Sequence, residues 1–248
     1  KLKLKYLDIQ DNIKNLLPSL NNLLFETEPS LFTNKGKIFS TYYTILNIKK
    51  QFEPLLYFIS EIDFYNSIRT LHKEYKNKPN KFTLPDYIES NKIVFDINKC
   101  WHPYLTNKPV QNSINLKKNI IITGPNAAGK STFIKTLLIN NLLSQTISLS
   151  SSNSFRFTPF ENFNSYLHIP DTKGKESLFE AEMNRSLDYI SFLENNKKKK
   201  SFIIMDEIFS STNNTEGVEA AKIVCNKLTK FKNNITLLTT HYNELSKL

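Results

Sequence analysis

A phosphate-binding pattern is present in the stretch TGPNAAGKSTF, residues 123–133. It fits G-x-x-x-x-G-K-S/T, and two of the chain's five glycines occupy the glycine positions. Glycine lets the backbone turn tightly, so that N–H groups point inward at phosphate oxygens. The lysine would reach the β- and γ-phosphates of a nucleotide, the serine hydroxyl would hold Mg²⁺, and the following helix would place its positive dipole end under the anion. The predicted phosphate contacts are Gly124, Pro125, Asn126, Ala127, Ala128, Gly129, Lys130, Ser131 and Thr132.

A pair of carboxylates follows an apolar run in SFIIMDEIFSS, residues 201–211. Asp206 is expected to hold Mg²⁺ directly or through water, together with Ser131. A carboxylate beside the metal can orient an attacking water and accept its proton, and we predict this role for Glu207. The alternative, a strand-end turn without chemistry, is disfavoured downstream of a phosphate loop. In LLTTHYNEL, His241 could contact the γ-phosphate and report its loss, or it could be a structural residue.

The elements that must position these residues alternate between strand and helix patterns after residue 85. Strands are expected at 92–97, 119–123, 201–207 and 234–241, and helices at 130–143 and 215–229. Such alternation predicts an α/β fold with a parallel sheet.

The first eighty residues have helical periodicity instead. Apolar residues recur at helical spacing over 13–24, where Pro18 should interrupt the helix. A stronger helix is expected to begin near Pro54, because proline is tolerated in a first turn. Its apolar stripe, predicted to be core, comprises Leu55, Ile59, Ile62, Tyr65 and Ile68. The polar segment KNKPNKFTLP, residues 76–85, is interpreted as a linker.

The composition is that of a globular protein with a polyanionic partner. Net charge is +10, which suits nucleic acid, although the many Lys, Asn and Ile residues are also typical of AT-rich genomes. Lys197–Lys200 could form a solvated loop or contact a phosphate backbone. No apolar run reaches the roughly 20 residues that cross a bilayer. Cys100 and Cys225 are expected to be reduced, buried thiols. The sequence lacks a starting methionine, so its true N-terminus is expected elsewhere.

In their order, TGPNAAGKSTF, DEIFSSTNNTEG and TTHYNEL resemble the C-terminal ATPase of the MutS mismatch-repair family, which belongs to the ABC-type ATPases. WHPYL, residues 101–105, resembles the family's His-Pro signature, and GKESLFEAEM, residues 174–183, resembles its signature segment. By that match Ser177 aligns with the serine that reaches the other subunit's γ-phosphate across a dimer interface. Phe179 and Glu182 align with the signature's phenylalanine and glutamate.

The resemblance extends upstream and also has departures. Residues 57–68 resemble the end of the lever helix between the DNA clamp and the ATPase, and FTLPDY resembles the following connector. Residues 166–182 are similar to divergent MutS-like proteins, including those of large DNA viruses. Residues 209–212, Phe-Ser-Ser-Thr, replace the usual Gly-Arg-Gly-Thr, so the arginine is lost. Pro109 or Val110 replaces the adenine-stacking aromatic, which leaves adenine recognition open. Relatives continue past residue 248, so a truncated C-terminus is expected.

The resemblance implies an ABC-type P-loop ATPase over residues 81–248, preceded by an all-α lever segment over residues 1–80. It implies intracellular hydrolysis of ATP with Mg²⁺ in a homodimer or related heterodimer, which switches a clamp on mismatched or damaged double-stranded DNA. Glu207, His241 and Ser177 of the partner subunit would be catalytic. A transport or chromosome-organising ATPase is disfavoured because Leu-Ser-Gly-Gly and flanking heptads are missing from the sequence. A module that binds ATP without hydrolysing it is disfavoured by Glu207.

Overall fold

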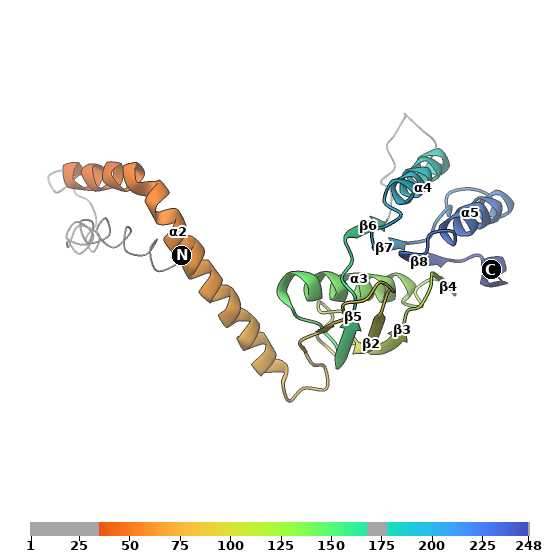
Figure 1. Ribbon diagram of the computed structural model, residues 1–248, viewed down its shortest axis with the longest axis horizontal. Helices are drawn as coiled ribbons and strands as arrows, with labels where there is room; N and C mark the ends of the chain where they lie inside the picture. Colours follow the sequence, from red (N-terminus) through yellow and green to blue (C-terminus); the bar gives the residue numbers. More distant parts are fainter. Residues whose placement is uncertain (1–34, 168–177, 248) are drawn as a thin grey trace. The chain divides into compact units, whose positions relative to one another are not determined.

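The structure, a computed structural model, describes residues 35–167 and 178–247 (Figure 1). The chain divides into two compact units, residues 1–70 and residues 71–248. The helical pattern predicted over residues 13–24 lies outside the described residues. Within the described part, no helix combines the length and the apolar character needed to cross a membrane.

Helix α2 spans Lys35–Tyr75 and contains Pro54 in its interior. The prediction that a helix begins near Pro54 was therefore wrong. Proline lacks the N–H that would bond one turn back, and its ring crowds the carbonyl there, so an interior proline bends a helix more readily than it ends one when both flanks favour helix. The ribbon of α2 accordingly changes direction part-way along its length (Figure 1).

The apolar stripe of α2 is not core in the described part of the chain. Ile59, Ile62 and Tyr65 are 52%, 53% and 62% exposed. Ile68 is half-buried, and the side chain of Leu55 lies outside the described residues. Helical spacing correctly placed these residues on a helix, but spacing does not reveal whether another element covers the stripe.

The predicted parallel sheet is present and has the order β4-β8-β7-β6. Every neighbouring pair in it is parallel. In register, Thr123 pairs with Thr240 and Met205 pairs with Leu238, so three strands end along one edge. The strands are β4 (Ile120–Thr123), β6 (Asn162–Tyr166), β7 (Ser201–Met205) and β8 (Asn234–Thr240).

A second sheet, which the sequence patterns did not predict, has the order β1-β5-β2-β3. Its β1–β5 pair is parallel, and the other two pairs are antiparallel. The strands are β1 (Asp86–Tyr87), β2 (Phe95–Cys100), β3 (Asn112–Asn115) and β5 (Ser154–Phe157). The expected strand at 92–97 thus begins three residues later, at Phe95.

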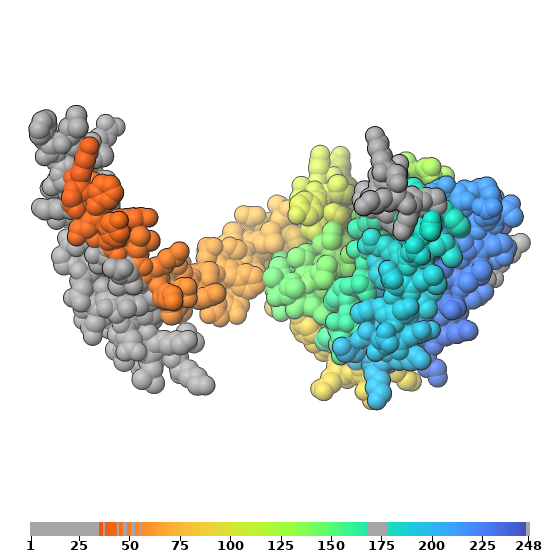
Figure 2. Space-filling model, turned by 90° about the horizontal axis from the view of Figure 1, so that it is seen from above, coloured from red at the N-terminus to blue at the C-terminus, as the bar shows by residue number. Residues whose placement is uncertain are grey.

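Helices cover both faces of the parallel sheet. Helix α3 (Lys130–Ile147) lies on one face, and α4 (Leu178–Asn195) and α5 (Asn214–Leu228) lie on the other (Figure 1). Figure 2 shows α4 and α5 side by side. The Asn213 side chain caps α5 by accepting a hydrogen bond from the Glu216 N–H, as expected for a residue at this position. A short 3₁₀ helix, Asn243–Lys247, follows β8.

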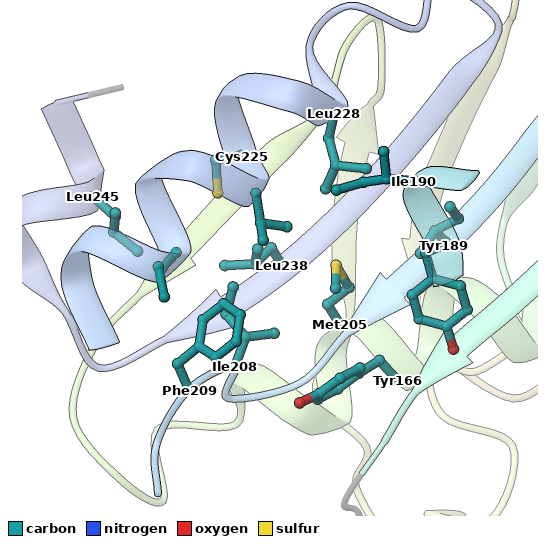
Figure 3. Close-up of a cluster of buried hydrophobic side chains, with 14 of the residues drawn as sticks. Tyr166, Tyr189, Ile190, Met205, Ile208, Phe209, Cys225, Leu228, Leu238 and Leu245 are labelled. Atoms are coloured by element: carbon teal, nitrogen blue, oxygen red, sulfur yellow. The ribbon is translucent and has the colours of Figure 1, made fainter. Parts of the chain in front are cut away.

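Two apolar clusters follow from the alternation of side chains along the buried strands. In β7, Ile203 and Met205 join the cluster under α4 and α5, whereas Phe202 and Ile204 join the cluster that α3 shares with the second sheet. Figure 3 shows the first cluster, where Met205 lies among side chains from α4 and α5. These two packed faces hold the strand ends in fixed relation.

The segment interpreted as a linker is partly buried. Phe82 is 6% exposed, and its ring contacts Trp101 at a centroid distance of 5.0 Å. Thr83 forms an isolated bridge with Ser150, and the Trp101 Nε1–H donates to the Lys81 carbonyl at 3.0 Å. The segment is therefore part of the larger unit, residues 71–248, and its aromatic residue packs into that unit.

The two cysteines are free and buried, as predicted. Burial raises the pKa of Cys100 to about 12 and that of Cys225 to about 11. The thiolate is the reactive form, so both thiols should stay protonated and inert at about pH 8. We expect iodoacetamide to label neither cysteine in the native chain and both in guanidinium chloride, as measured by mass spectrometry. Rapid labelling of either one in the native chain would contradict their burial.

Candidate functional site

The predicted phosphate contacts, residues 124–132, comprise the loop between β4 and α3 (residues 124–129) and the first turn of α3. Gly129 precedes the first residue of α3 with φ at +86°, a left-handed conformation that strains other residues. A Cβ there would meet nothing within 4 Å, so backbone conformation and not space requires glycine. Glycine has no side chain to cap the first N–H groups of α3, which leaves them available to an anion.

Lys130 lies under this loop and is only 6% exposed. Its Nζ donates to the carbonyl oxygens of Gly124 at 2.9 Å and Pro125 at 3.0 Å. A carboxylate oxygen of Glu207 lies 3.8 Å from the same nitrogen. A buried ammonium with these partners can bind an anion entering the loop.

Asp206, at the end of β7, is the point where the loop and the carboxylate strand meet. Its Oδ1 accepts hydrogen bonds from the Ser131 hydroxyl at 2.7 Å and the Thr239 hydroxyl at 2.6 Å. Its Oδ2 lies 3.8 Å from the Lys135 Nζ. The two predicted metal ligands, Ser131 and Asp206, are thus in direct contact.

Glu207 has a strained backbone and an accessible side chain. Its φ is +51°, which is uncommon for a residue with a Cβ and is typical of functional sites. Its N–H donates to the Thr239 hydroxyl at 2.9 Å, and its side chain is 43% exposed. The carboxylate can therefore reach a ligand or a water molecule in front of the loop.

The segment after Glu207 is held from two sides. The Tyr242 hydroxyl donates to the Phe209 carbonyl at 2.6 Å. The Ser211 hydroxyl donates to the Glu182 carboxylate at 2.6 Å. The Phe179 and Phe209 rings pack edge to face, with their centroids 5.7 Å apart. Residues 209–211 depart from the pattern of the resembled family, and here they connect α4 with Tyr242, the residue before the 3₁₀ helix.

Gly217 in α5 makes room for one of these contacts. A methyl group there would overlap the Tyr242 hydroxyl and lie 2.9 Å from the Phe209 carbonyl oxygen. We expect Gly217→Ala to lower the free energy of unfolding by about 2–4 kcal/mol, through overpacking and loss of a buried hydrogen bond. Guanidinium unfolding measures this change.

A matched control is Gly36→Ala, because a Cβ at Gly36 meets nothing within 4 Å. Tyr242→Phe, which removes the hydrogen bond without adding a methyl group, should cost about 1–2 kcal/mol. A Gly217→Ala chain as stable as the wild type would show that the turn after Glu207 is not tightly held.

His241 and Ser177 are not joined to this cluster by the described contacts. His241 follows β8, is exposed, and packs its ring against Tyr242 at 4.2 Å. Among residues 35–167 and 178–247, no hydrogen bond or ion pair involves its imidazole. Ser177 lies outside the described residues.

The His-Pro segment lies beside α3. Trp101 is fully buried, and the Ser151 hydroxyl donates to its carbonyl at 2.7 Å. Burial and the positive charge of Lys135 lower the pKa of His102 below its usual value. Nearby, Val110 is 77% exposed, and Pro109 lines a hollow of about 780 Å³ whose one aromatic member is Tyr75.

A smaller cavity of about 230 Å³ adjoins the two carboxylates. The buried Tyr166 hydroxyl has no hydrogen-bond partner among the described residues. Burial, followed by the Glu182 carboxylate, raises the pKa of Tyr166 well above its ordinary range. The lining residues are Tyr166, Leu178, Glu182, Asp206, Glu207, Ser210 and Ser211.

Sequence reasoning missed Thr239 and Lys135, both of which contact Asp206 or its neighbour. Lys135 lies one helical turn after Ser131, so helical spacing could have placed it on the same face. Thr239 lies in a buried strand of sequence NITLLTT, where a threonine is unremarkable by pattern alone.

The arrangement can bind an anion and a divalent cation together. The loop and Lys130 offer positive charge, while Ser131 and Asp206 offer two oxygen ligands. Among the described residues, His, Cys, Asp and Glu side chains do not gather in any group of three or more that could hold a metal ion. Mg²⁺ commonly takes one or two protein oxygens and completes its shell with phosphate and water, so these residues fit a magnesium nucleotide.

Comparison with known proteins agrees over this region. A family model described as MutS domain V matches residues 120–248. The chain is 33% identical over 176 residues to MutS protein homolog 4 of Mus musculus, covering 67% of this chain and 18% of that protein. It is 28% identical over 239 residues to the DNA mismatch repair protein MutS of Ehrlichia chaffeensis, covering 94% and 28%. Endonuclease MutS2 of Agathobacter rectalis is 30% identical over 192 residues, covering 75% and 23%. The chain spans less than a third of each relative's length.

Proposed function

The chain belongs to the MutS family, and on that premise we propose that it binds and hydrolyses ATP with Mg²⁺ to switch a clamp on DNA. The observation that carries the proposal is the direct contact between Ser131, in the first turn of α3, and Asp206, the residue after β7, at 2.7 Å. This contact brings the two candidate metal ligands to the mouth of a loop whose lysine is buried beneath it. A relative that is a DNA mismatch repair protein supports mismatched or damaged double-stranded DNA as the substrate of the whole protein.

The proposed roles of the loop, Lys130, Ser131, Asp206 and Glu207 are supported by their positions, whereas that of His241 rests on the resemblance of its segment. The backbone of residues 124–132 and Lys130 bind the phosphates of ATP, and Ser131 and Asp206 hold Mg²⁺. Mg²⁺ held by these two residues would supply positive charge to the phosphates during transfer of the γ-phosphoryl group to water, with ADP as the leaving group. Glu207, accessible and 3.8 Å from Lys130, orients the attacking water and accepts its proton. His241 senses the γ-phosphate, a role that requires its exposed ring to turn toward the loop.

We further propose that the site is completed by Ser177 of the partner subunit, in a homodimer or related heterodimer. Catalysis of this kind depends mostly on positioning and charge stabilisation, so an incomplete site should bind nucleotide but turn it over slowly. Residues 1–80 would act as the lever segment and residues 81–248 as the ATPase, working inside the cell. The segment 166–182 supports a divergent branch of the family, similar to proteins of large DNA viruses.

The deciding experiment measures ATP turnover per chain as the protein concentration is raised. A shared site predicts turnover that increases with concentration and is stimulated more by mismatched than by matched duplex DNA. Brisk turnover independent of concentration would contradict the shared site, and absence of magnesium-nucleotide binding would contradict the whole proposal. Equal stimulation by both duplexes would favour a different ATPase of the same fold.

A further inference from the structure

We propose that Thr239 is a positioning residue, whose one hydroxyl orients both the metal-binding Asp206 and the water-orienting Glu207. This inference rests on the proposed function and assigns a role to a residue that the sequence analysis did not single out, although it is the first residue of the segment TTHYNEL. Thr239 touches no substrate in this account, and it acts only through its two neighbours.

The contacts of Thr239 use its hydrogen-bonding capacity in both directions. Its O–H donates to Asp206 Oδ1 at 2.6 Å, and its oxygen accepts the Glu207 N–H at 2.9 Å. A hydroxyl has one donor, and here that donor is committed to the carboxylate. The carboxylate of one residue and the backbone of the next are therefore held by a single oxygen atom.

The place of Thr239 in the fold makes this contact possible. Strand β8 lies between β4, which leads into the loop, and β7, which ends beside Asp206. Thr239 pairs with Ile122, and it lies one residue beyond Leu238, the partner of Met205. Its hydroxyl consequently reaches the turn where β7 ends.

The burial of Thr239 indicates that its hydroxyl serves these two hydrogen bonds. Thr239 is fully buried at the end of a strand in which every residue is buried. Valine has nearly the same shape and would fill this space without burying a polar atom. A buried hydroxyl is costly unless hydrogen bonded, and both bonds of this one go to the carboxylate pair.

Glu207 shows what the positioning accomplishes. Its φ of +51° is a conformation that the surrounding structure must impose. The Thr239 oxygen holds the Glu207 N–H from one side, while Ser131 and Thr239 together fix one oxygen of Asp206. Asp206 Oδ2 remains toward Lys135, at 3.8 Å. Loss of the hydroxyl would free both the Asp206 rotamer and the strained Glu207 backbone.

The test compares Thr239→Val, which removes the hydroxyl, with Thr239→Ser, which keeps it. In the full chain, Thr239→Val should lower kcat about 10- to 100-fold and raise the half-saturating Mg²⁺ concentration several-fold, because misplaced groups lose orientation. Binding of a fluorescent ATP analogue without Mg²⁺ should not change. Thr239→Ser should remain within about threefold of the wild type.

A readout independent of turnover is amide exchange at Glu207 in the nucleotide-free chain. Thr239→Val should speed this exchange at least about tenfold, and Thr239→Ser should not, because the acceptor of the N–H is lost only in the first. The matched control is Thr236→Val, a buried threonine of the same strand whose hydroxyl accepts from Asn234 instead, at 2.7 Å. If Thr239→Val unfolds the chain, Thr239→Ala removes the hydroxyl with less steric demand.

The outcomes separate this inference from the proposed function. Wild-type turnover matched by Thr239→Val, with unchanged exchange at Glu207, would overturn the inference and leave the ATPase proposal intact. A wild-type chain that binds no magnesium nucleotide would overturn the ATPase proposal. Amide exchange at Glu207 still tests the inference in that case, because it is measured without nucleotide. If Thr239→Val did not speed this exchange, positioning by Thr239 would be overturned as well.

Discussion

Replacing Lys130 by methionine is expected to weaken ATP binding by at least about 100-fold and to remove detectable hydrolysis, since charge-assisted contacts to phosphate are lost. Lys130, the first residue of α3, is the buried cation beneath the loop of residues 124–129, and its Nζ points at the carbonyls of Gly124 and Pro125. A triphosphate entering the loop would take the place of these carbonyl partners. Titration with a fluorescent ATP analogue measures the affinity.

The stability of the Lys130→Met chain provides the necessary control. Removing a buried ammonium also removes its desolvation cost, so the Tm should not fall by more than a few degrees. Lys118→Met, at an exposed lysine just before β4, should leave ATP binding unchanged. Undiminished binding by a folded Lys130→Met chain would show that the loop does not bind phosphate.

Glu207→Gln should separate binding from hydrolysis. The glutamine has the same shape but cannot accept a proton, so kcat is expected to fall by about 10²- to 10⁴-fold while the affinity for magnesium ATP remains within a few-fold. The backbone strain at φ of +51° is common to both side chains. Single-turnover hydrolysis and equilibrium binding, measured on the same preparation, give the two quantities.

Glu219→Gln is the matched control, because the Glu219 side chain is 63% exposed and, within the part of the chain that the structure describes, pairs only with Lys222 of α5 at 2.8 Å. It should leave both binding and turnover unchanged. If Glu207→Gln hydrolysed ATP at the wild-type rate, the water-orienting role would pass to another group. If the wild type itself bound ATP without hydrolysing it, the chain would be an ATP-dependent fastening module.

Contiguous patterns could be predicted from the sequence because their residues are neighbours along the chain. Residues 124–132 form one loop and the first turn of the helix that follows it, and Asp206 and Glu207 directly follow an apolar strand. In a parallel sheet the carboxyl ends of the strands share an edge, so the expected proximity of the loop and the carboxylates follows from alternation of strands and helices. The hydrogen bond from Ser131 to Asp206 agrees with that expectation.

The second sheet could not be predicted in the same way. Strand β3 has the sequence NSIN, and β5 has the sequence SFRF, so neither contains a run of apolar residues. Their stability comes from partners far along the chain, such as Ile97 opposite Phe155 and Asp96 opposite Asn115. The prediction that the stripe of α2 is core failed for a related reason. Periodicity shows which residues share a helix face, but it does not show whether another element covers that face.

The amino-acid sequence by itself determined which residues could carry charge and oxygen ligands: Lys130, Ser131, Asp206 and Glu207 were identifiable from local spacing. Only the tertiary structure decided that Thr239 contacts Asp206, which lies 33 residues earlier, and Glu207 beside it. The physical reason is the order of the strands. Strand β8 lies between β4 and β7 in the sheet. The buried Thr239 hydroxyl can reach Asp206 and Glu207 only because this order places β8 beside the end of β7.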